Sequence, residues 1–246
     1  MKPMNKTEKE EYVFRVFQKI ADSYDSANQR ISIGAHMRWK RNAARVMCAL
    51  LPEECSILDI GCGTGDMLRI FSSERPHAKL TGLDFSPNML RVAGERCRDL
   101  AHLSLMQGNA MDLPFAEGSF DGASISFALR NTADYSTTLR EAARVLRAGG
   151  MLLVIDSFVP KSPLVQPFYH LYFSKLMPIL GGGLRRRTEY RWLTRSTKEF
   201  VSTDRLQEMM HEAGFKICGK KTFLFGACAC VLGNKNTGGE SVDTGI

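Results

Sequence analysis

The sequence predicts an α/β protein built on a seven-stranded, mostly parallel sheet, with helices on both faces and an antiparallel hairpin at the end of the chain. Between Ser56 and Phe158, short apolar segments alternate with amphipathic segments five times, which is typical of a parallel sheet covered by helices. A glycine-rich turn follows the first apolar segment directly. Two further apolar segments adjoin one another in residues 215–234, where we expect the hairpin.

Five strands of the alternating region are expected at residues 56–61, 79–84, 102–108, 120–129 and 151–158. Helices are expected between them over residues 66–73, 87–98 and 135–150. Ser86 is a typical N-cap and Pro87 a typical first helical residue. Gly149 and Gly150 are typical of the end of a helix.

The rest of the chain is less regular. Residues 164–200 are aromatic and basic and predict no strand, whereas a helix is expected over 202–214. We expect a single domain with four parts, which are a helical cap (1–48), the main domain (49–234), a helical and basic insertion within it (about 160–200) and a disordered tail (235–246).

Composition excludes several classes of protein. The chain is 44% hydrophobic and 24% charged, within the globular range. The longest clean apolar run, Met151 to Ile155, is far shorter than the ~18 residues that a membrane-spanning helix needs, and the polar start predicts no signal peptide. Seven cysteines, an odd number, fit reduced thiols in a cytoplasm. Cys228 and Cys230 stand without a partner pair or a nearby histidine, so we expect no metal.

Positive charge lies in the flanks of the sequence. Residues 1–48 carry 10 Lys and Arg against 5 Asp and Glu, residues 49–157 carry 10 against 14, and residues 158–246 carry 13 against 7. The densest part runs from Gly183 to Lys198. Such a stripe indicates nucleic acid, an anionic membrane surface or only a solvated face.

The turn GCGTG (61–65) lets the backbone approach a ligand closely and aims the following helix N-terminus at it. A dinucleotide fingerprint reads G-x-G-x-x-G, but Asp66 stands where its third glycine would be. A carboxylate there would repel a pyrophosphate and would suit a cation such as S-adenosylmethionine. Asp84, at the end of the second strand, is placed to accept hydrogen bonds from a ribose diol. The alternative is an ordinary strand-to-helix turn with a capping aspartate.

Four segments look like the sequential motifs of class I S-adenosylmethionine-dependent methyltransferases, which have a Rossmann-like fold. They are ILDIGCGTGD (57–66), GLDFSPNML (82–90), GNAMDLPFAEGSFD (108–121) and REAARVLRAGGMLLVID (140–156). Residues 17–41, SISFALRNTADY (124–135) and residues 199–215 resemble the ubiquinone/menaquinone biosynthesis methyltransferase family. The resemblance covers roughly residues 14–234, and the LRN motif (129–131) is its most specific part.

This resemblance implies methylation of a ring carbon of a polyprenylated benzo- or naphthohydroquinol. It implies that the cofactor contacts Asp59, Gly61, Gly63, Thr64, Gly65, Asp84, Asn109, Ala110 and Ser126. The chain departs from the family pattern at Ala128, Thr132, Asp156 and residues 226–233. These departures leave room for a relative that acts on another aromatic or lipidic acceptor.

A hydroquinol carbon becomes nucleophilic when the neighbouring hydroxyl loses its proton, so the site needs a proton acceptor and donors that hold the oxyanion. We expect Arg130 to pair with the phenolate, Asn131 to bond a ring oxygen and Tyr24 to complete the proton relay. The alternatives are an Arg130–Asp134 ion pair and a Tyr24 that only packs in the cap. His36 and His170 are weaker candidates for the base, and Met89 and Phe127 are expected to form walls.

Residues 164–198 join an aromatic, apolar stretch to the arginine cluster, which suits a lipid-borne ring taken from an anionic membrane. The expected partners are thus a quinol and the inner face of the membrane, and no nucleic acid is expected. The sequence leaves open whether the chain forms a homodimer. The alternative for this segment is a lid with solvated arginines. The rival functions are a nicotinamide dehydrogenase, a nucleic-acid methyltransferase, a non-catalytic cofactor-binding protein and a methyltransferase for another acceptor.

Overall fold

The structure, a computed structural model, describes residues 4–32, 34–172 and 187–236. The helices are α1 (Lys6–Ile20), α2 (Tyr24–Ser32), α3 (Ala35–Ala49), α4 (Asp66–Glu74), α5 (Pro87–Arg96), α6 (Tyr135–Val145), α7 (Gln166–Leu171), α9 (Arg187–Glu199) and α10 (Thr203–Glu212). Short 3₁₀ turns are η1 (Ala21–Ser23), η2 (Leu129–Asn131) and η4 (Leu224–Gly226). The strands are β1 (Ser56–Ile60), β2 (Lys79–Asp84), β3 (Leu103–Gln107), β4 (Phe120–Ser126), β5 (Leu146–Ser157), β6 (Phe215–Phe223) and β7 (Cys228–Lys235).

The seven strands form one sheet in the order β3-β2-β1-β4-β5-β7-β6. Strands β1 to β5 are parallel, and β7 runs antiparallel to both β5 and β6. The predicted fold class and the terminal hairpin are therefore confirmed. The strand order reverses between β1 and β4, which is where open α/β sheets bind ligands, beyond the carboxyl ends of the strands.

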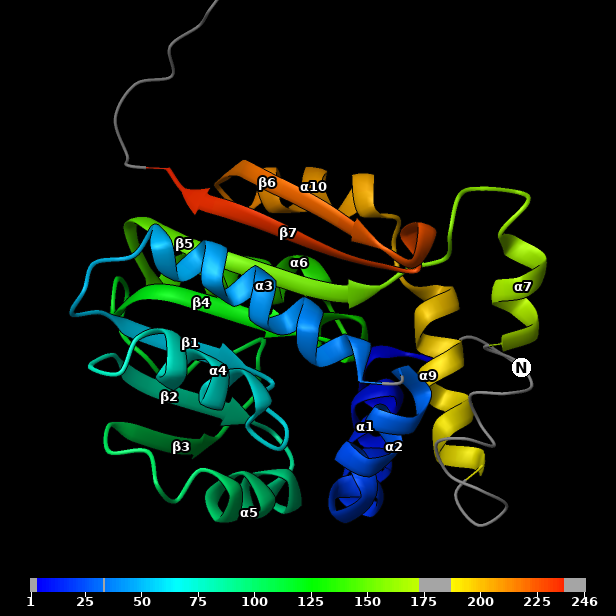
Figure 1. Cartoon of the computed structure of the whole chain (residues 1–246), viewed down its shortest axis with the longest axis horizontal. Coiled ribbons are helices and arrows are strands. Elements are labelled where there is room, and N and C mark those ends of the chain that lie inside the picture. The colour runs from blue at the N-terminus through cyan, green and yellow to red at the C-terminus, as the bar shows by residue number, and fades with distance from the viewer. Residues whose placement is uncertain (1–3, 33, 173–186, 237–246) are drawn as a thin grey trace, which may run out of the picture.

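Alternation along the strands places the core on both faces of the sheet. In β5, Leu152 and Val154 belong to the cluster formed with α6 and α10, whereas Leu153 and Ile155 belong to the cluster formed with α3 and α4. Successive side chains of a strand point to opposite faces, so the apolar run of β5 fills both layers. Figure 1 shows α3 and α4 in front of the sheet and α6 and α10 behind it.

A third apolar cluster joins the N-terminal helices to the carboxyl edge of the sheet. It contains Val16 and Ile20 of α1, Met89 of α5, and Trp192 and Leu193 of α9. As a result, α1 and α2 lie beyond the carboxyl ends of the strands, beside α9 (Figure 1). No helix in the described part of the chain is long and apolar enough to cross a bilayer.

Two predicted boundaries are wrong. The helix expected over 135–150 ends at Val145, and β5 already begins at Leu146. Leu146 pairs with Phe120 while Met151 pairs with Gly122, so the residues between them bulge out of the strand pair and the two glycines do not end a helix. The fourth strand ends at Ser126 rather than at residue 129, and the chain then turns through η2. In the described part of the predicted 164–200 segment, the helices are α7 and α9. Residues 173–186 of this segment and residues 237–246 of the predicted tail lie outside the described residues.

Candidate functional site

A first cavity, of about 510 Å³, lies beyond the carboxyl ends of β1, β2 and β4 and is closed on one side by α1. Six of the nine residues predicted to contact the cofactor line it, namely Gly61, Gly63, Asp84, Asn109, Ala110 and Ser126. The sheet edge thus brings together residues from four separate segments of the chain.

The glycine turn leaves space for a ligand. Gly61 and Gly63 have φ values of 70° and 54°, which favour glycine. A Cβ at Gly61 would lie 2.5 Å from the Cβ of Ala128, whereas one at Gly63 would meet nothing within 4 Å. Packing therefore requires glycine at position 61, and Gly63 keeps its side of the cavity open. Ser126 lines the same cavity, and its buried hydroxyl has no hydrogen-bond partner among the described residues.

Asp84, the last residue of β2, binds the glycine turn from the neighbouring strand. Its carboxylate accepts hydrogen bonds from the backbone N–H of Gly63 (2.8 Å) and of Ser86 (2.9 Å). Burial raises the pKa of Asp84 to about 6, although these hydrogen bonds oppose the shift. Asn109 accepts from the N–H of Met111 at 3.0 Å. Carboxylate oxygens have further lone pairs, so Asp84 can also accept from hydroxyls of a ligand in the cavity.

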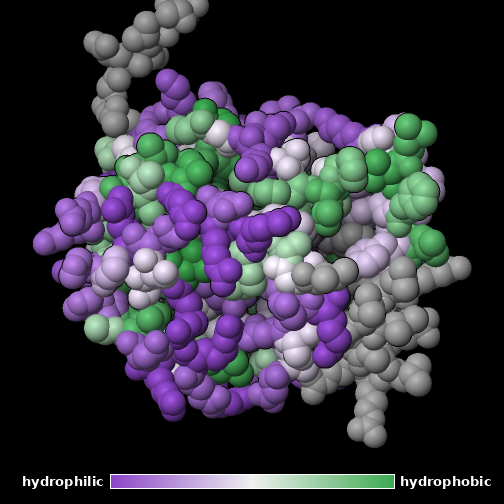
Figure 2. Space-filling view, viewed as in Figure 1, coloured by the Kyte–Doolittle hydropathy of each residue, from purple (hydrophilic) through white to green (hydrophobic). Residues whose placement is uncertain are grey.

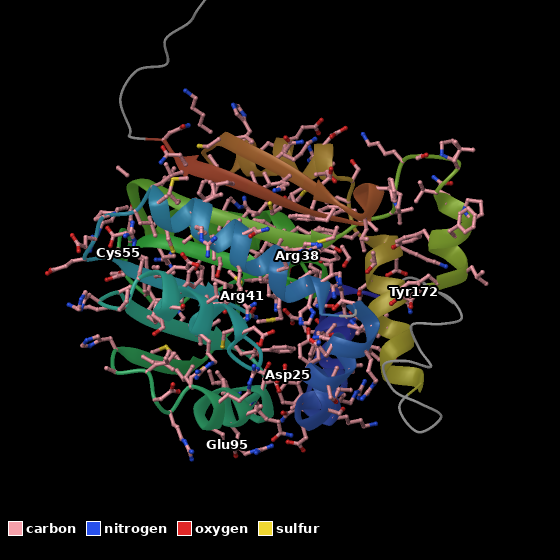
Figure 3. The ribbon with its side chains drawn as sticks, viewed as in Figure 1. Asp25, Arg38, Arg41, Cys55, Glu95 and Tyr172 are labelled. Atoms are coloured by element: carbon pink, nitrogen blue, oxygen red, sulfur yellow. The ribbon has the colours of Figure 1, made fainter. Side chains whose placement is uncertain are left out.

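Asp59, Thr64 and Gly65 are not part of the lining of the first cavity. Asp59 is buried and accepts a hydrogen bond from the Ser124 hydroxyl at 2.6 Å, and burial raises its pKa to about 7. The hydroxyl of Thr64 donates to Asp25 at 2.6 Å, where α2 approaches the glycine turn (Figure 3). These residues hold the loop in place, and their predicted contact with the cofactor stays a prediction.

The expectation that Asp66 faces a cationic ligand is wrong. Its carboxylate binds Lys40 at 3.1 Å and Arg96 at 2.9 Å, and it does not line the first cavity. Burial alone would raise the pKa of Asp66, but Lys40 and Arg96 outweigh it and lower the pKa to about 2. The protein's own cations from α3 and α5 therefore neutralise this carboxylate.

A second cavity, of about 410 Å³, lies beside the first. Its lining is largely aromatic and apolar, with Trp39 from α3 and Phe168 and Tyr169 from α7, and it also carries Arg130 and His36. Tyr24 and Phe127 line both cavities. The two cavities therefore share a wall made by these two residues. The backbone of Phe127 has a φ of 56°, which is unusual for a residue other than glycine.

Arg130 lies on the wall of the second cavity and is buried. Its guanidinium pairs with Asp156, and one of its nitrogens also donates to the Phe127 carbonyl at 3.0 Å. The Arg130–Asp134 alternative is wrong, because Asp134 caps α6 and binds Lys6 at 2.6 Å. The Nε of Arg130 has no hydrogen-bond partner among the described residues.

The other predicted catalytic residues divide between the cavities. Asn131 lines only the first cavity, and its amide accepts from the Trp192 indole at 3.0 Å and donates to the Phe127 carbonyl at 3.2 Å. Tyr24 faces both cavities. Met89 and Phe127 form walls, as predicted, and the side chain of His170 lies outside the described residues.

Sequence reasoning missed the contribution of α1 to the first cavity, where Val13, Phe14 and Phe17 form part of the wall. Their spacing of three and four residues on a helix was the one available signal. It also missed η4, whose Leu224 lines the second cavity. Within residues 4–32, 34–172 and 187–236, no three or more His, Cys, Asp or Glu side chains gather where they could hold a metal ion.

Comparison with known proteins places the chain among methyltransferases. Residues 5–235 match the ubiE/COQ5 methyltransferase family. The chain is 41% identical over 231 residues to the demethylmenaquinone methyltransferase of Listeria monocytogenes serotype 4b, covering 92% of this chain and 97% of that one. It is 40% identical over 234 residues to the demethylmenaquinone methyltransferase of Staphylococcus carnosus, covering 94% and 95%.

Solved structures share the fold at lower identity. A SAM-dependent methyltransferase from Thermotoga maritima superposes with a TM-score of 0.60 at 22% identity, covering 91% of this chain and all of that one. A second, from Aquifex aeolicus, superposes with a TM-score of 0.54 at 16% identity, covering 75% and 84%. These likenesses confirm the fold alone.

Proposed function

The chain belongs to the ubiE/COQ5 methyltransferase family, and we propose that it transfers a methyl group from S-adenosylmethionine to a ring carbon of a polyprenylated hydroquinol. Since the relatives compared above are named demethylmenaquinone methyltransferases, the naphthohydroquinol demethylmenaquinol is the proposed acceptor. The observation that carries this proposal is the pair of cavities that share the Tyr24 and Phe127 wall.

The first cavity fits the methyl donor. When bound, S-adenosylmethionine supplies an electrophilic methyl group on a sulfonium. Asp84 would accept from its ribose hydroxyls, the unpartnered Ser126 hydroxyl would bond a polar group, and the open side of Gly63 would accommodate its bulk. Methyl transfer is an in-line displacement, and such positioning can supply ~7–11 kcal/mol of the barrier.

The second cavity fits a flat apolar ring that develops negative charge. Its aromatic lining would bury the ring, and Arg130, whose guanidinium pairs with Asp156, lies on the same wall. Arg130 would stabilise the phenolate oxygen, and Tyr24, which lines both cavities, would hydrogen-bond the acceptor. Asn131 lines only the first cavity and would hydrogen-bond a ring oxygen from that side of the shared wall.

This function can be tested by incubating the protein with demethylmenaquinol under anaerobic conditions, which keep the substrate reduced, and by analysing the quinones with mass spectrometry. We expect a gain of one methyl group that depends on S-adenosylmethionine, with the oxidised quinone unreactive because it has no hydroxyl to ionise. A benzoquinol run in parallel reports ring selectivity. Absence of any methylated product from either quinol would refute the proposal and favour a methyltransferase for another acceptor.

An exposed apolar surface adjoins the second cavity. We name it the apolar rim, and it consists of Leu164, Phe168, Leu171, Leu224 and Phe225, whose exposure ranges from 51% to 84%. Figure 2 shows the corresponding apolar side chains gathered over α7 and the β6–β7 connection. Phe168 and Leu224 also line the second cavity, so the rim borders this cavity. We propose that the rim contacts the inner face of the cytoplasmic membrane, where the prenyl tail of the quinol resides.

Flotation with anionic and with neutral liposomes tests this contact. The double variant Phe168→Ser/Phe225→Ser should lose flotation, whereas the control Leu50→Ser should keep it, since Leu50 is 57% exposed at the end of α3 and lies outside the rim. More protein should float with anionic liposomes than with neutral ones. Equal recovery with both liposomes, or none with either, would remove the membrane proposal and leave the enzymatic one intact.

A further inference from the structure

His36 lies on the wall of the second cavity and is 8% exposed. It belongs to α3, whose side chains otherwise pack on the sheet beside α4. An imidazole in this position faces the space where the proposed function puts the hydroquinol.

Ser32 engages one of the two imidazole nitrogens of His36. The hydroxyl of Ser32 donates to the carbonyl of Asn28 at 2.8 Å, so its oxygen is left to accept. This oxygen lies 2.5 Å from Nδ1 of His36. The neutral imidazole can therefore place its hydrogen on Nδ1 toward this oxygen, and in that tautomer the lone pair of Nε2 can accept a proton.

The charged groups around His36 come from three neighbouring elements as well as its own. Asp66 of α4 lies 4.0 Å from Nε2, and it is bound by Lys40 of α3 and by Arg96 of α5. Asp25 of α2 binds Arg96 in turn. Burial and Lys40 lower the pKa of His36 to about 4, against the opposing effect of Asp66, so the imidazole is neutral at pH 7 and can act as a base.

Four other titratable groups on this cavity wall are poorer bases, namely Arg130, Tyr169, Tyr172 and Cys228. Arg130 is permanently charged and pairs with Asp156. Burial raises the pKa values of Tyr169, Tyr172 and Cys228, so these groups keep their protons at neutral pH.

We propose that His36 is the catalytic base of the reaction and that Ser32 is a positioning residue that holds its Nδ1–H. This inference rests on the proposed function. The hydroxyl proton of the hydroquinol passes to Nε2, and the oxygen keeps the electron pair. The ring carbon forms a bond to the methyl carbon as the methyl–sulfur bond breaks, and sulfur takes that electron pair. The ring carbon then loses its hydrogen as a proton to solvent, and the imidazolium returns its proton to the ring oxygen.

The test is the pH dependence of kcat for demethylmenaquinol between pH 6 and pH 9 in the wild type, His36→Gln, His36→Asn and the control His102→Gln, whose histidine is exposed before β3. Wild type and control should be independent of pH up to about 8. At pH 7 the two His36 variants should lose on the order of 100-fold in kcat. Their rate should rise about tenfold per pH unit, because a phenolic hydroxyl with a pKa of about 10 must then ionise unaided.

Affinity for S-adenosylmethionine should stay unchanged in all variants, because His36 is not part of the first cavity, and this binding also reports that each variant is folded. A His36→Gln or His36→Asn variant with wild-type kcat, or with a lower kcat that runs parallel to the wild type at every pH, would overturn the assignment. A wild type that methylates no quinol would instead refute the proposed function itself.

Discussion

Replacement of Asp84 by alanine tests the donor site most directly. Its carboxylate joins the glycine turn to the end of β2 through the N–H groups of Gly63 and Ser86, and it faces the first cavity. If its remaining lone pairs accept from the ribose hydroxyls, Asp84→Ala removes a charged acceptor from the bound state.

Hydrogen bonds to a charged group contribute about 1.5–3 kcal/mol, which corresponds to roughly a 10- to 150-fold increase in Kd for S-adenosylmethionine. Because the pKa of Asp84 is raised to about 6, its carboxylate becomes protonated as the pH falls through 6 and loses acceptor capacity. Affinity in the wild type should therefore fall below pH 6, and the variant should lack this dependence.

Isothermal titration calorimetry with S-adenosylmethionine measures both effects. The matched control is Asp121→Ala, because Asp121 is also a buried strand aspartate that accepts a backbone N–H, that of Ser56 at 2.8 Å, but it lies outside the first cavity. The control should lose stability and keep its affinity. A Kd for Asp84→Ala within about twofold of the wild type would refute the ribose assignment.

Three further predictions concern neighbouring groups. Gly63→Ala and Gly214→Ala should each lower the free energy of unfolding by about 1–2 kcal/mol, since both glycines have positive φ and open space where a Cβ would stand. Only Gly63→Ala should weaken cofactor binding in calorimetry. Equal affinities of the two variants for the cofactor would show that Gly63 does not border the donor. Arg130→Lys should lower kcat on the order of 100-fold with little change in cofactor Kd, and normal turnover would leave Arg130 a structural residue. The lowered pKa of Asp66, about 2 against an ordinary 3.8, contributes about 2 kcal/mol of stability above pH 4, and this contribution is lost as the pH falls toward 2. Urea unfolding at several pH values should show that Lys40→Met reduces this loss. A pH dependence of stability that is the same in the variant and the wild type would contradict the pairing of Asp66 with Lys40.

The sequence predicted the parallel sheet and the hairpin, because these depend on local periodicity and on turn residues. For the first cavity, the sequence predicted Gly61, Gly63 and Asp84 from the glycine turn and the strand end, and Asn109, Ala110 and Ser126 only through the family resemblance. It failed at Leu146, where an apolar residue after an amphipathic helix fits either the helix or the next strand, and only pairing with Phe120 decides. It failed at Asp66 because Lys40 and Arg96, 26 and 30 residues away in sequence, reach its carboxylate through the tertiary fold.

The second cavity was the least predictable part of the site. Its wall combines α2, α3, α7, η2 and η4, and no single segment contains enough of the lining to form a motif. Trp39, for example, reads in the sequence as an ordinary apolar residue of a helix.

The partition formed by Tyr24 and Phe127 has a thermodynamic consequence. The Phe127 ring is held by a backbone whose N–H donates to Ile155 at 2.7 Å and whose carbonyl accepts from both Arg130 and Asn131. Any ligand that shifts this ring on one side alters the shape offered to the ligand on the other, so occupancy of the two compartments must be energetically linked, and by the same factor in both directions. Binding of the methyl donor would then change the affinity for the acceptor, and binding of the acceptor would change the affinity for the donor, before methyl transfer begins.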